Sequence, residues 1–189
     1  MASMSKPYPS GSQWMAENLD YNVTGSVCYE NNDKNCAKYG RLYDWATAMA
    51  LDVSCNSESC SEQINAKHKG ICPSGWHIPS VYELIDLFNY VESNSGCSGC
   101  AGKHLKAQKG WSSDAYHDGQ DTYGFSALPG GTYDTILHTF SGVGYGGDWW
   151  ATDDSEFQAT HCSMSYRFDE AGHGGMLKSS FSSVRCLKD

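Results

Sequence analysis

Nine cysteines in a chain of 189 residues constrain this protein more than any other feature. A protein of this size in a reducing compartment rarely carries so many thiols without metal, so we expect disulfides and an oxidising compartment. Three pairs are close enough in sequence to close short local loops: Cys28 with Cys36, Cys55 with Cys60, and Cys97 with Cys100. Cys72, Cys162 and Cys186 remain, which predicts one further bridge and one thiol left over.

Metal binding is the alternative use of these cysteines. Cys97-x-x-Cys100 followed by His104 is a partial zinc-ligand pattern, which Cys55 and Cys60 could complete. Zinc is less favoured because the chain has no second closely spaced Cys-x-x-Cys pair. A redox-active Cys-x-x-Cys is less favoured still, because it needs a strand before it and a helix after it, whereas these flanks are rich in Ser and Gly.

Length, charge and residue content limit the class of protein. The length suits one domain with one core, and residues 1–12 resemble a leader or linker remnant. A net charge of −9 would repel phosphates, so no nucleic-acid partner is expected. No apolar run is long enough to insert in a membrane, and no signal peptide is recognisable, so export is inferred from the cysteines alone.

Two segments have helical hydrophobic spacing. In the first, residues 42–49, four apolar side chains fall on one face: Leu42, Trp45, Ala46 and Met49. The second helix, residues 81–92, is preceded by a capping box of Ser80 and Glu83. Just before this box, we expect Trp76 to cover the core and His77 to be structural, because no nucleophile lies nearby in sequence.

The remaining segments have the character of strands. Alternation or strand-favouring residues predict strands at residues 14–23, 123–128, 162–168 and 176–189. Trp149 and Trp150 are neighbours on another predicted strand, so their side chains should point to opposite sides. Helices early and strands late predict an α+β domain without internal repeats.

Six ordered motifs carry a resemblance to a known family. They are "WMAENLDYNV", "CAKYGRLYDWATAM", "CPSGWHIPS", "YGFSALPGG", "DWWAT" and "SVRCLKD". The chain resembles a Fibrobacter succinogenes major paralogous (FISUMP) domain over residues 13–189. This resemblance implies a C-type lectin-like fold, similar to that of formylglycine-generating enzymes, with two helices packed on short antiparallel sheets. It further implies that a Cys72–Cys186 bridge joins the last strand to the region before the second helix.

The same resemblance implies a ligand surface on the late strands and loops. Its expected members are Tyr145, Asp148, Trp149, Asp153, Glu156, His161, Tyr166 and Asp169, with Asp154 and His173 as further candidates. Aromatic faces with a few aimed carboxylates suit sugars. Calcium is an optional ligand of Asp153 and Asp154 or of Asp118 and Asp121, against the alternative that these are solvated turns. The chain lacks the Glu-Pro-Asn and Gln-Pro-Asp signatures of calcium-dependent lectins, and no cofactor is required.

An enzyme is not expected. The cysteine pair of formylglycine-generating enzymes has no counterpart, because Cys186 is needed for the bridge and Cys162 is distant from it in sequence. The histidines show no ligand spacing on a predicted helix. We therefore expect an extracellular, non-catalytic binding module of a larger secreted or surface protein, which recognises plant cell wall polysaccharide. The alternatives are recognition of a surface protein and a structural role in a surface layer or appendage.

Overall fold

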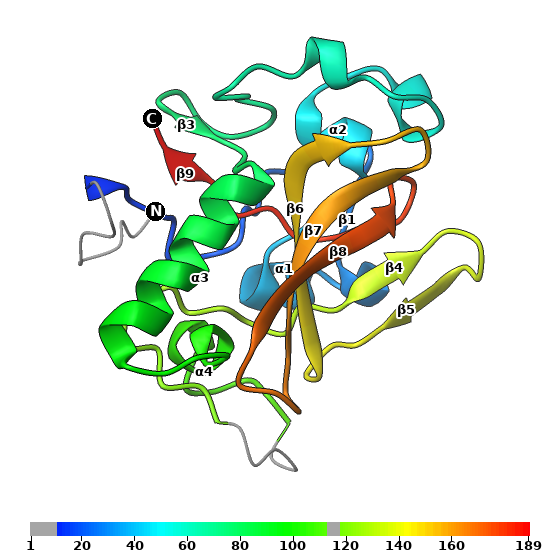
Figure 1. Ribbon diagram of the computed structural model, residues 1–189. Coiled ribbons are helices and arrows are strands. Elements are labelled where there is room, and N and C mark those ends of the chain that lie inside the picture. Colours follow the sequence, from blue (N-terminus) through cyan, green and yellow to red (C-terminus); the bar gives the residue numbers. More distant parts are fainter. Residues whose placement is uncertain (1–10, 113–117) are drawn as a thin grey trace.

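The computed structural model describes residues 11–112 and 118–189. A three-stranded antiparallel sheet lies at its centre, one long helix packs beside it, and short helices and hairpins surround both (Figure 1). Residues 1–10 of the predicted leader lie outside the described residues. The structure confirms a mixed domain with few helices, small antiparallel sheets and several disulfides.

The helices are short with one exception. They are α1 (Asp33–Tyr39), α2 (Trp45–Met49), α3 (Val81–Ser95) and α4 (Ala101–Leu105), with 3-10 turns η2 (Tyr29–Asn31), η3 (Val53–Asn56) and η4 (Ser61–Gln63). Small sheets pair β1 (Ser26–Val27) with β2 (Leu42–Tyr43), β3 (Trp76–His77) with β9 (Leu187–Lys188), and β4 (Thr132–Asp134) with β5 (Thr139–Ser141). The central sheet has the order β6 (Gly146–Asp154), β7 (Gln158–Ser165) and β8 (Ala171–Leu177).

Helix α3 confirms the predicted second helix. The Ser80 side chain accepts the N–H of Glu83, and the Glu83 carboxylate accepts the N–H of Ser80, so the capping box is complete. Of the predicted apolar face, Leu84, Phe88 and Val91 are buried and Val81 and Ile85 are partly buried, and Leu87 is buried as well. The helix continues to Ser95 and ends at Gly96, which adopts the left-handed conformation that glycine favours.

The predicted first helix begins later than expected. Leu42 lies in strand β2, and Asp44 then caps α2 by accepting the N–H of Thr47. An Asp at the N-cap is a stronger start signal than the apolar spacing that we extended back to Leu42. Trp45 and Met49 are buried on α2 as predicted.

Several predicted strands are wrong or displaced. Residues 123–128 form no strand, because the Asp121 carboxylate binds the N–H and hydroxyl of Ser126 and closes a local turn. Residues 14–23 make only irregular pairing, such as the bridge between Trp14 and Leu187. Strand β7 ends at Ser165, short of the predicted residue 168. The predicted return strand, residues 176–189, is divided between the end of β8 and β9.

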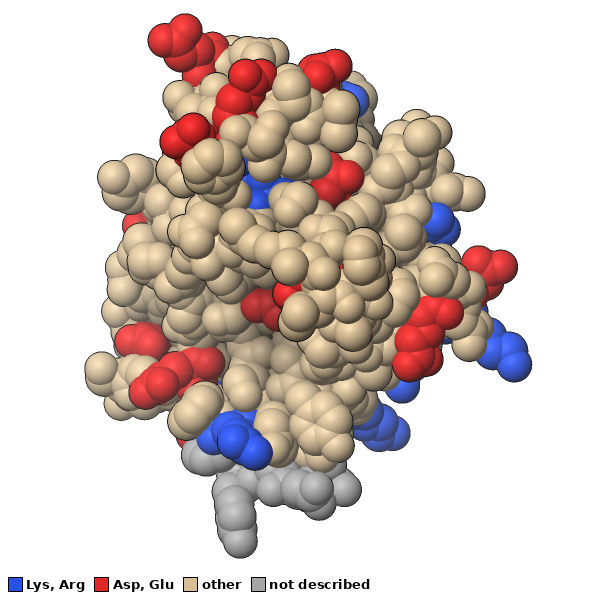
Figure 2. Space-filling view, turned by 90° about the vertical axis from the view of Figure 1, so that its right-hand side faces the viewer, with Lys and Arg blue, Asp and Glu red and all other residues tan. Residues whose placement is uncertain are grey.

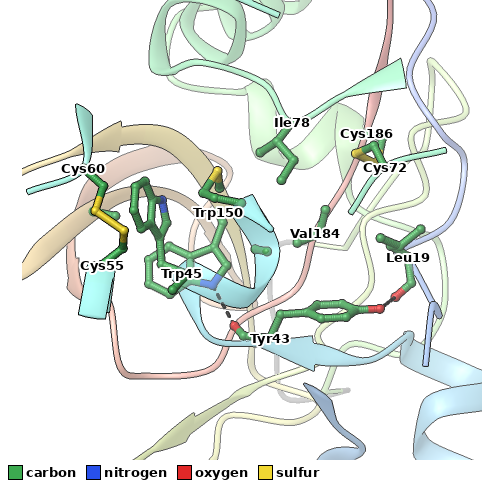
Figure 3. Packing of buried hydrophobic residues seen from close by; sticks show 14 of the residues in the cluster. Leu19, Tyr43, Trp45, Cys55, Cys60, Cys72, Ile78, Trp150, Val184 and Cys186 are labelled. Carbon is green, nitrogen blue, oxygen red and sulfur yellow. Dashed lines mark hydrogen bonds between the residues drawn. A yellow bond between two sulfur atoms is a disulfide. The ribbon is translucent and has the colours of Figure 1, made fainter. Parts of the chain in front are cut away.

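Strand β6 of the central sheet is buried on both faces at two adjacent tryptophans, which pack into different cores. Trp149 packs with α3 residues in the first core, whereas Trp150 packs with Tyr43 and Trp45 in the second. The Trp150 indole N–H donates to the Tyr43 carbonyl, 2.8 Å away (Figure 3). The two tryptophans point to opposite faces, as predicted. Trp76 is half-buried against the second core and covers it, again as predicted.

A buried polar network joins the beginning and the end of the domain. Asn18 Oδ1 accepts hydrogen bonds from the Trp149 indole at 2.7 Å and from Arg185 Nη2 at 2.6 Å. Arg185 is 1% exposed and also donates to the carbonyls of Met15 and Phe125. A buried cation needs such partners, so these hydrogen bonds fix the entry segment against the segment that leaves β8.

All four expected disulfides are present. They are Cys28–Cys36, Cys55–Cys60, Cys72–Cys186 and Cys97–Cys100. Cys72–Cys186 joins residues 114 positions apart within the second core (Figure 3). A bridge across so long a loop contributes about 4–5 kcal/mol on the chain-entropy model. Cys162 is the remaining thiol and is buried.

Candidate functional site

Tyr145 and Tyr166 meet at the end where β6 begins and β7 finishes. The Tyr166 N–H donates to the Tyr145 carbonyl at 2.9 Å, which extends the pairing of the two strands by one step. The rings lie edge to face, with centroids 5.0 Å apart, and Tyr145 is 50% exposed. The Arg167 guanidinium lies 5.2 Å from the centre of the Tyr166 ring. We call Tyr145, Tyr166 and Arg167 the tyrosine end of the hairpin.

Asp148 and His161 form a second predicted pair that the structure brings together. His161 lies directly opposite Trp150, and Asp148 is two positions before Trp150, so all three share a sheet face. His161 Nε2 lies 3.4 Å from Asp148 Oδ1, and both side chains are largely buried. Among the described residues, the buried Nδ1 of His161 has no hydrogen-bond partner.

The acids at the other end of the hairpin have partners inside the protein. Asp153 Oδ2 accepts the N–H of Val81 at 2.6 Å, and so ties the sheet to the first turn of α3. Asp154 Oδ2 accepts from Lys178 Nζ and from the Cys60 N–H, each at 3.0 Å. Glu156 is exposed in the connecting turn. We call Asp153, Asp154 and Glu156 the acidic end of the hairpin.

The predicted ligand residues therefore do not form one site. Strand β6 spans nine residues, so the acidic end and the tyrosine end are roughly 25 Å apart. Asp169 lies near the tyrosine end in sequence, with its carboxylate 3.9 Å from Lys103 Nζ. His173 lies on the edge strand β8, opposite Cys162 and exposed.

The prediction that Trp149 is exposed to ligand is wrong. Trp149 is 1% exposed and packs edge to face against Phe125 in the first core, with ring centroids 6.4 Å apart. Alternation predicted that one of the two tryptophans is in the core. Both are buried because each face of the central sheet carries a core, which alternation along a single strand does not reveal.

The predicted calcium ligands are likewise separated or occupied. The Asp121 carboxylate binds Ser126, as described above, and Asp153 and Asp154 have the partners just given. Asp118 is exposed. Within residues 11–112 and 118–189, the one group of His, Cys, Asp and Glu side chains with metal-binding geometry is Cys97, Cys100 and His104.

His77 takes part in a charged cluster that the sequence did not reveal. Its ring is 1% exposed, with Nε2 3.0 Å from Glu83 Oε1 and Nδ1 2.8 Å from Asp189 Oδ1. Burial opposes the charged ring, but the hydrogen bonds to Glu83 and Asp189 outweigh burial and raise the pKa of His77. Burial raises the pKa of Glu83, but the hydrogen bonds from His77 and Ser80 outweigh burial, so that its pKa is lowered. Glu83 could have been suspected from its capping position, whereas Asp189 is distant in sequence.

Two further titratable groups differ in their access to solvent. Burial raises the pKa of the Cys162 thiol and keeps it protonated, so this cysteine is not an activated nucleophile. Partial burial lowers the pKa of His104 and keeps its ring neutral near pH 7. His104 Nε2 lies 3.9 Å from the sulfur of Cys97.

A comparison with protein-family models gives one match. The Fibrobacter succinogenes major domain matches residues 10–188, which is nearly the whole chain. The chain belongs to this family. The match includes the last three residues of the predicted leader, 10–12, and all four disulfide bridges.

Two further findings concern similarity to curated proteins and membrane-spanning helices. No curated protein matches the sequence. In the described part of the chain, no helix has both the length and the apolar character needed to cross a membrane.

Proposed function

We propose that this domain is an extracellular, non-catalytic binding module with a C-type lectin-like fold, which recognises carbohydrate of the plant cell wall. The observation that carries the proposal is the tyrosine pair at the tyrosine end, in which Tyr145 is 50% exposed and Tyr166 is partly exposed. Two adjacent aromatic rings offer apolar faces to a sugar ring, and the Tyr145 hydroxyl and the Arg167 guanidinium supply hydrogen bonds beside them.

The charge distribution on one face of the domain also supports a neutral ligand. Figure 2 shows the side of the molecule that lies on the right in Figure 1, where charged side chains gather mostly around the rim and neutral residues fill most of the centre. The Asp148 side chain, which is 21% exposed beside His161, adds a hydrogen-bond acceptor on the sheet. Hydroxyl pairs on polysaccharides are matched by such groups without a need for net charge.

Four disulfides and the buried, protonated Cys162 favour an extracellular role over catalysis. Disulfides persist in oxidising compartments, and Cys162 is withdrawn from solvent. The experiment is retention of the purified domain on insoluble cellulose and xylan, together with a glycan array. Saturable retention that falls on replacement of Tyr145 and Tyr166 by Ala supports the proposal, and absence of retention by every glycan contradicts it.

The second candidate is recognition of a surface protein. Ile136 and Leu137, each 68% exposed, lie at the tip of the β4–β5 hairpin, which extends from the body of the domain (Figure 1). Exposed aliphatic residues at a projecting tip favour a protein partner over a sugar. Loss of partner or self-association in an Ile136→Ser/Leu137→Ser variant, with polysaccharide retention absent throughout, would favour this candidate. Concentration-dependent elution in size-exclusion chromatography would indicate a structural assembly.

A further inference from the structure

The segment from Cys97 to His104 differs from the other disulfide loops in its surroundings. All nine cysteines lie in the described residues, and eight of them are buried, whereas Cys97 is half-exposed. A reductant therefore reaches the Cys97–Cys100 bridge more easily than the Cys55–Cys60 bridge, whose sulfurs lie in the second core.

The backbone holds three donor side chains together at this place. Cys97 directly follows Gly96, which ends α3, and its N–H donates to the Glu92 carbonyl. Cys100 is the N-cap of α4, and His104 is four positions later on the same helix face. The two sulfurs and one ring nitrogen of His104 all lie within 4.8 Å of one another.

The imidazole is already oriented toward the sulfurs. His104 Nδ1 lies 2.8 Å from the Thr122 hydroxyl, and the Thr122 N–H donates to the His104 carbonyl at 2.9 Å. This double connection leaves Nε2 facing Cys97, 3.9 Å from its sulfur. In tetrahedral zinc sites the sulfur and nitrogen ligands are about 3.6 Å apart, so Nε2 is already close to its position relative to Cys97. The two sulfurs must move apart from bonding distance, which reduction of the bridge allows. A hydrogen bond at the other ring nitrogen is the usual device that orients a metal-binding histidine.

We propose that Cys97, Cys100 and His104 form a three-ligand site for zinc once their disulfide is reduced. A dithiol reductant breaks the Cys97–Cys100 sulfur–sulfur bond, gives its two hydrogens to the sulfurs and becomes a disulfide itself. Zinc then displaces both protons as the thiolates bind, and His104 Nε2 supplies the third ligand. The fourth position stays open to water. A disulfide oxidant that re-forms the Cys97–Cys100 bond is itself reduced to two thiols, with two protons from water, and the metal is released. The site is thus a metal site controlled by redox state, independent of the proposed sugar binding.

Cobalt(II) tests this proposal, because thiolate binding to cobalt gives charge-transfer and visible absorption bands. The full chain is reduced with dithiothreitol under anaerobic conditions, desalted and titrated with Co²⁺, and peptide mapping identifies the opened bridge. We expect bands that saturate near one equivalent, are absent from the oxidised protein, and disappear on addition of excess zinc. Cys97→Ser should remove the charge-transfer band, and Cys55→Ser/Cys60→Ser should leave it unchanged.

Two variants that keep both cysteines test the site without removing a disulfide from the folded protein. His104→Ala should weaken cobalt affinity at least tenfold, and Thr122→Val should weaken it by about 10- to 100-fold through loss of imidazole orientation. The thermal unfolding of both oxidised variants shows that they are folded. A Cys97–Cys100 bridge that resists reduction, a reduced protein without thiolate bands, or affinity unchanged in His104→Ala would overturn the proposal.

Discussion

The two ends of the β6–β7 hairpin both carry predicted ligand residues, yet they differ in where those side chains are directed. At the acidic end, Asp154 is fully buried against Lys178, and Asp153 caps the first turn of α3. At the tyrosine end, Tyr145 is half-exposed, and its ring contacts are with Tyr166 on the surface. The acidic end therefore assembles the domain, and the tyrosine end faces outward.

The comparison shows that a cluster of acids in a turn is poor evidence of a cation site when neighbouring segments supply N–H and ammonium donors. Lys178 is 0% exposed, and its ammonium donates hydrogen bonds to the Asp154 carboxylate and to the carbonyls of Glu58 and Ser155. Its ammonium also lies 4.9 Å from the Trp45 ring centre. One buried cation thus joins the second core, the acidic end and the loop closed by Cys55 and Cys60.

The largest effect that we predict is at this buried pair. Asp154→Ala should lower the free energy of unfolding by about 3–5 kcal/mol, because Lys178 is left as an unpaired buried charge. The matched change at the other end, Tyr145→Ala, should cost less than about 1 kcal/mol, since a half-exposed ring loses little burial. Urea unfolding followed by tryptophan fluorescence measures both. Equal losses for the two variants would remove the distinction between the ends.

Replacement of Trp149 tests whether the aromatic residue between the two ends belongs to the core. Trp149→Ala should cost about 3–5 kcal/mol, because it leaves a cavity in the first core and removes the hydrogen bond to Asn18. Near-native stability with reduced ligand retention would instead place Trp149 at a binding surface. The same urea unfolding experiment, with retention measured in parallel, separates the two results.

The sequence predicted the four disulfides and helix α3. The predictions failed where contacts with segments distant in sequence determine the burial or the partners of a residue. The capping box of Ser80 and Glu83 is local, so α3 could be read directly. The expected strand at residues 123–128 failed because Asp121 binds Ser126 across a turn. Among the predicted ligand residues, Tyr145 meets Tyr166 and Asp148 meets His161, and their binding of a ligand stays a prediction. The sequence around Asp154 does not predict its hydrogen bond with Lys178, which lies 24 positions later in the chain.

A smaller effect is expected from pH at the start of α3, beside the acidic end. The folded state raises the pKa of His77 above its ordinary value of 6.5, so its contribution to stability is complete below that value and is lost as pH rises through the folded pKa. Glu83 has a lowered pKa, so its contribution holds above its ordinary 4.5 and is lost as pH falls through the folded pKa. The free energy of unfolding should therefore decline as pH rises above about 6.5 in the wild type and less so in His77→Gln. Parallel curves for the two proteins would contradict the role of the cluster.

The smallest effect is that of calcium, for which we expect no change in the midpoint of thermal unfolding. Asp153, Asp154 and Asp121 already accept hydrogen bonds from the protein, so their carboxylates offer little to a cation. Unfolding midpoints with calcium chloride and with EDTA should coincide. A midpoint that rises and saturates with calcium concentration would show that the acidic end opens to bind an ion.

Retention on insoluble plant polysaccharide tests most directly whether the tyrosine end is the binding surface. Tyr145→Ala/Tyr166→Ala should lower affinity at least tenfold with the fold intact, because the aromatic platform supplies the central contacts. Phe157→Ala is the matched control, since Phe157 is 53% exposed beside the acidic end. We predict that Phe157→Ala retains the affinity of the wild type. Retention unchanged in the double tyrosine variant, or lost only in Phe157→Ala, would contradict the account.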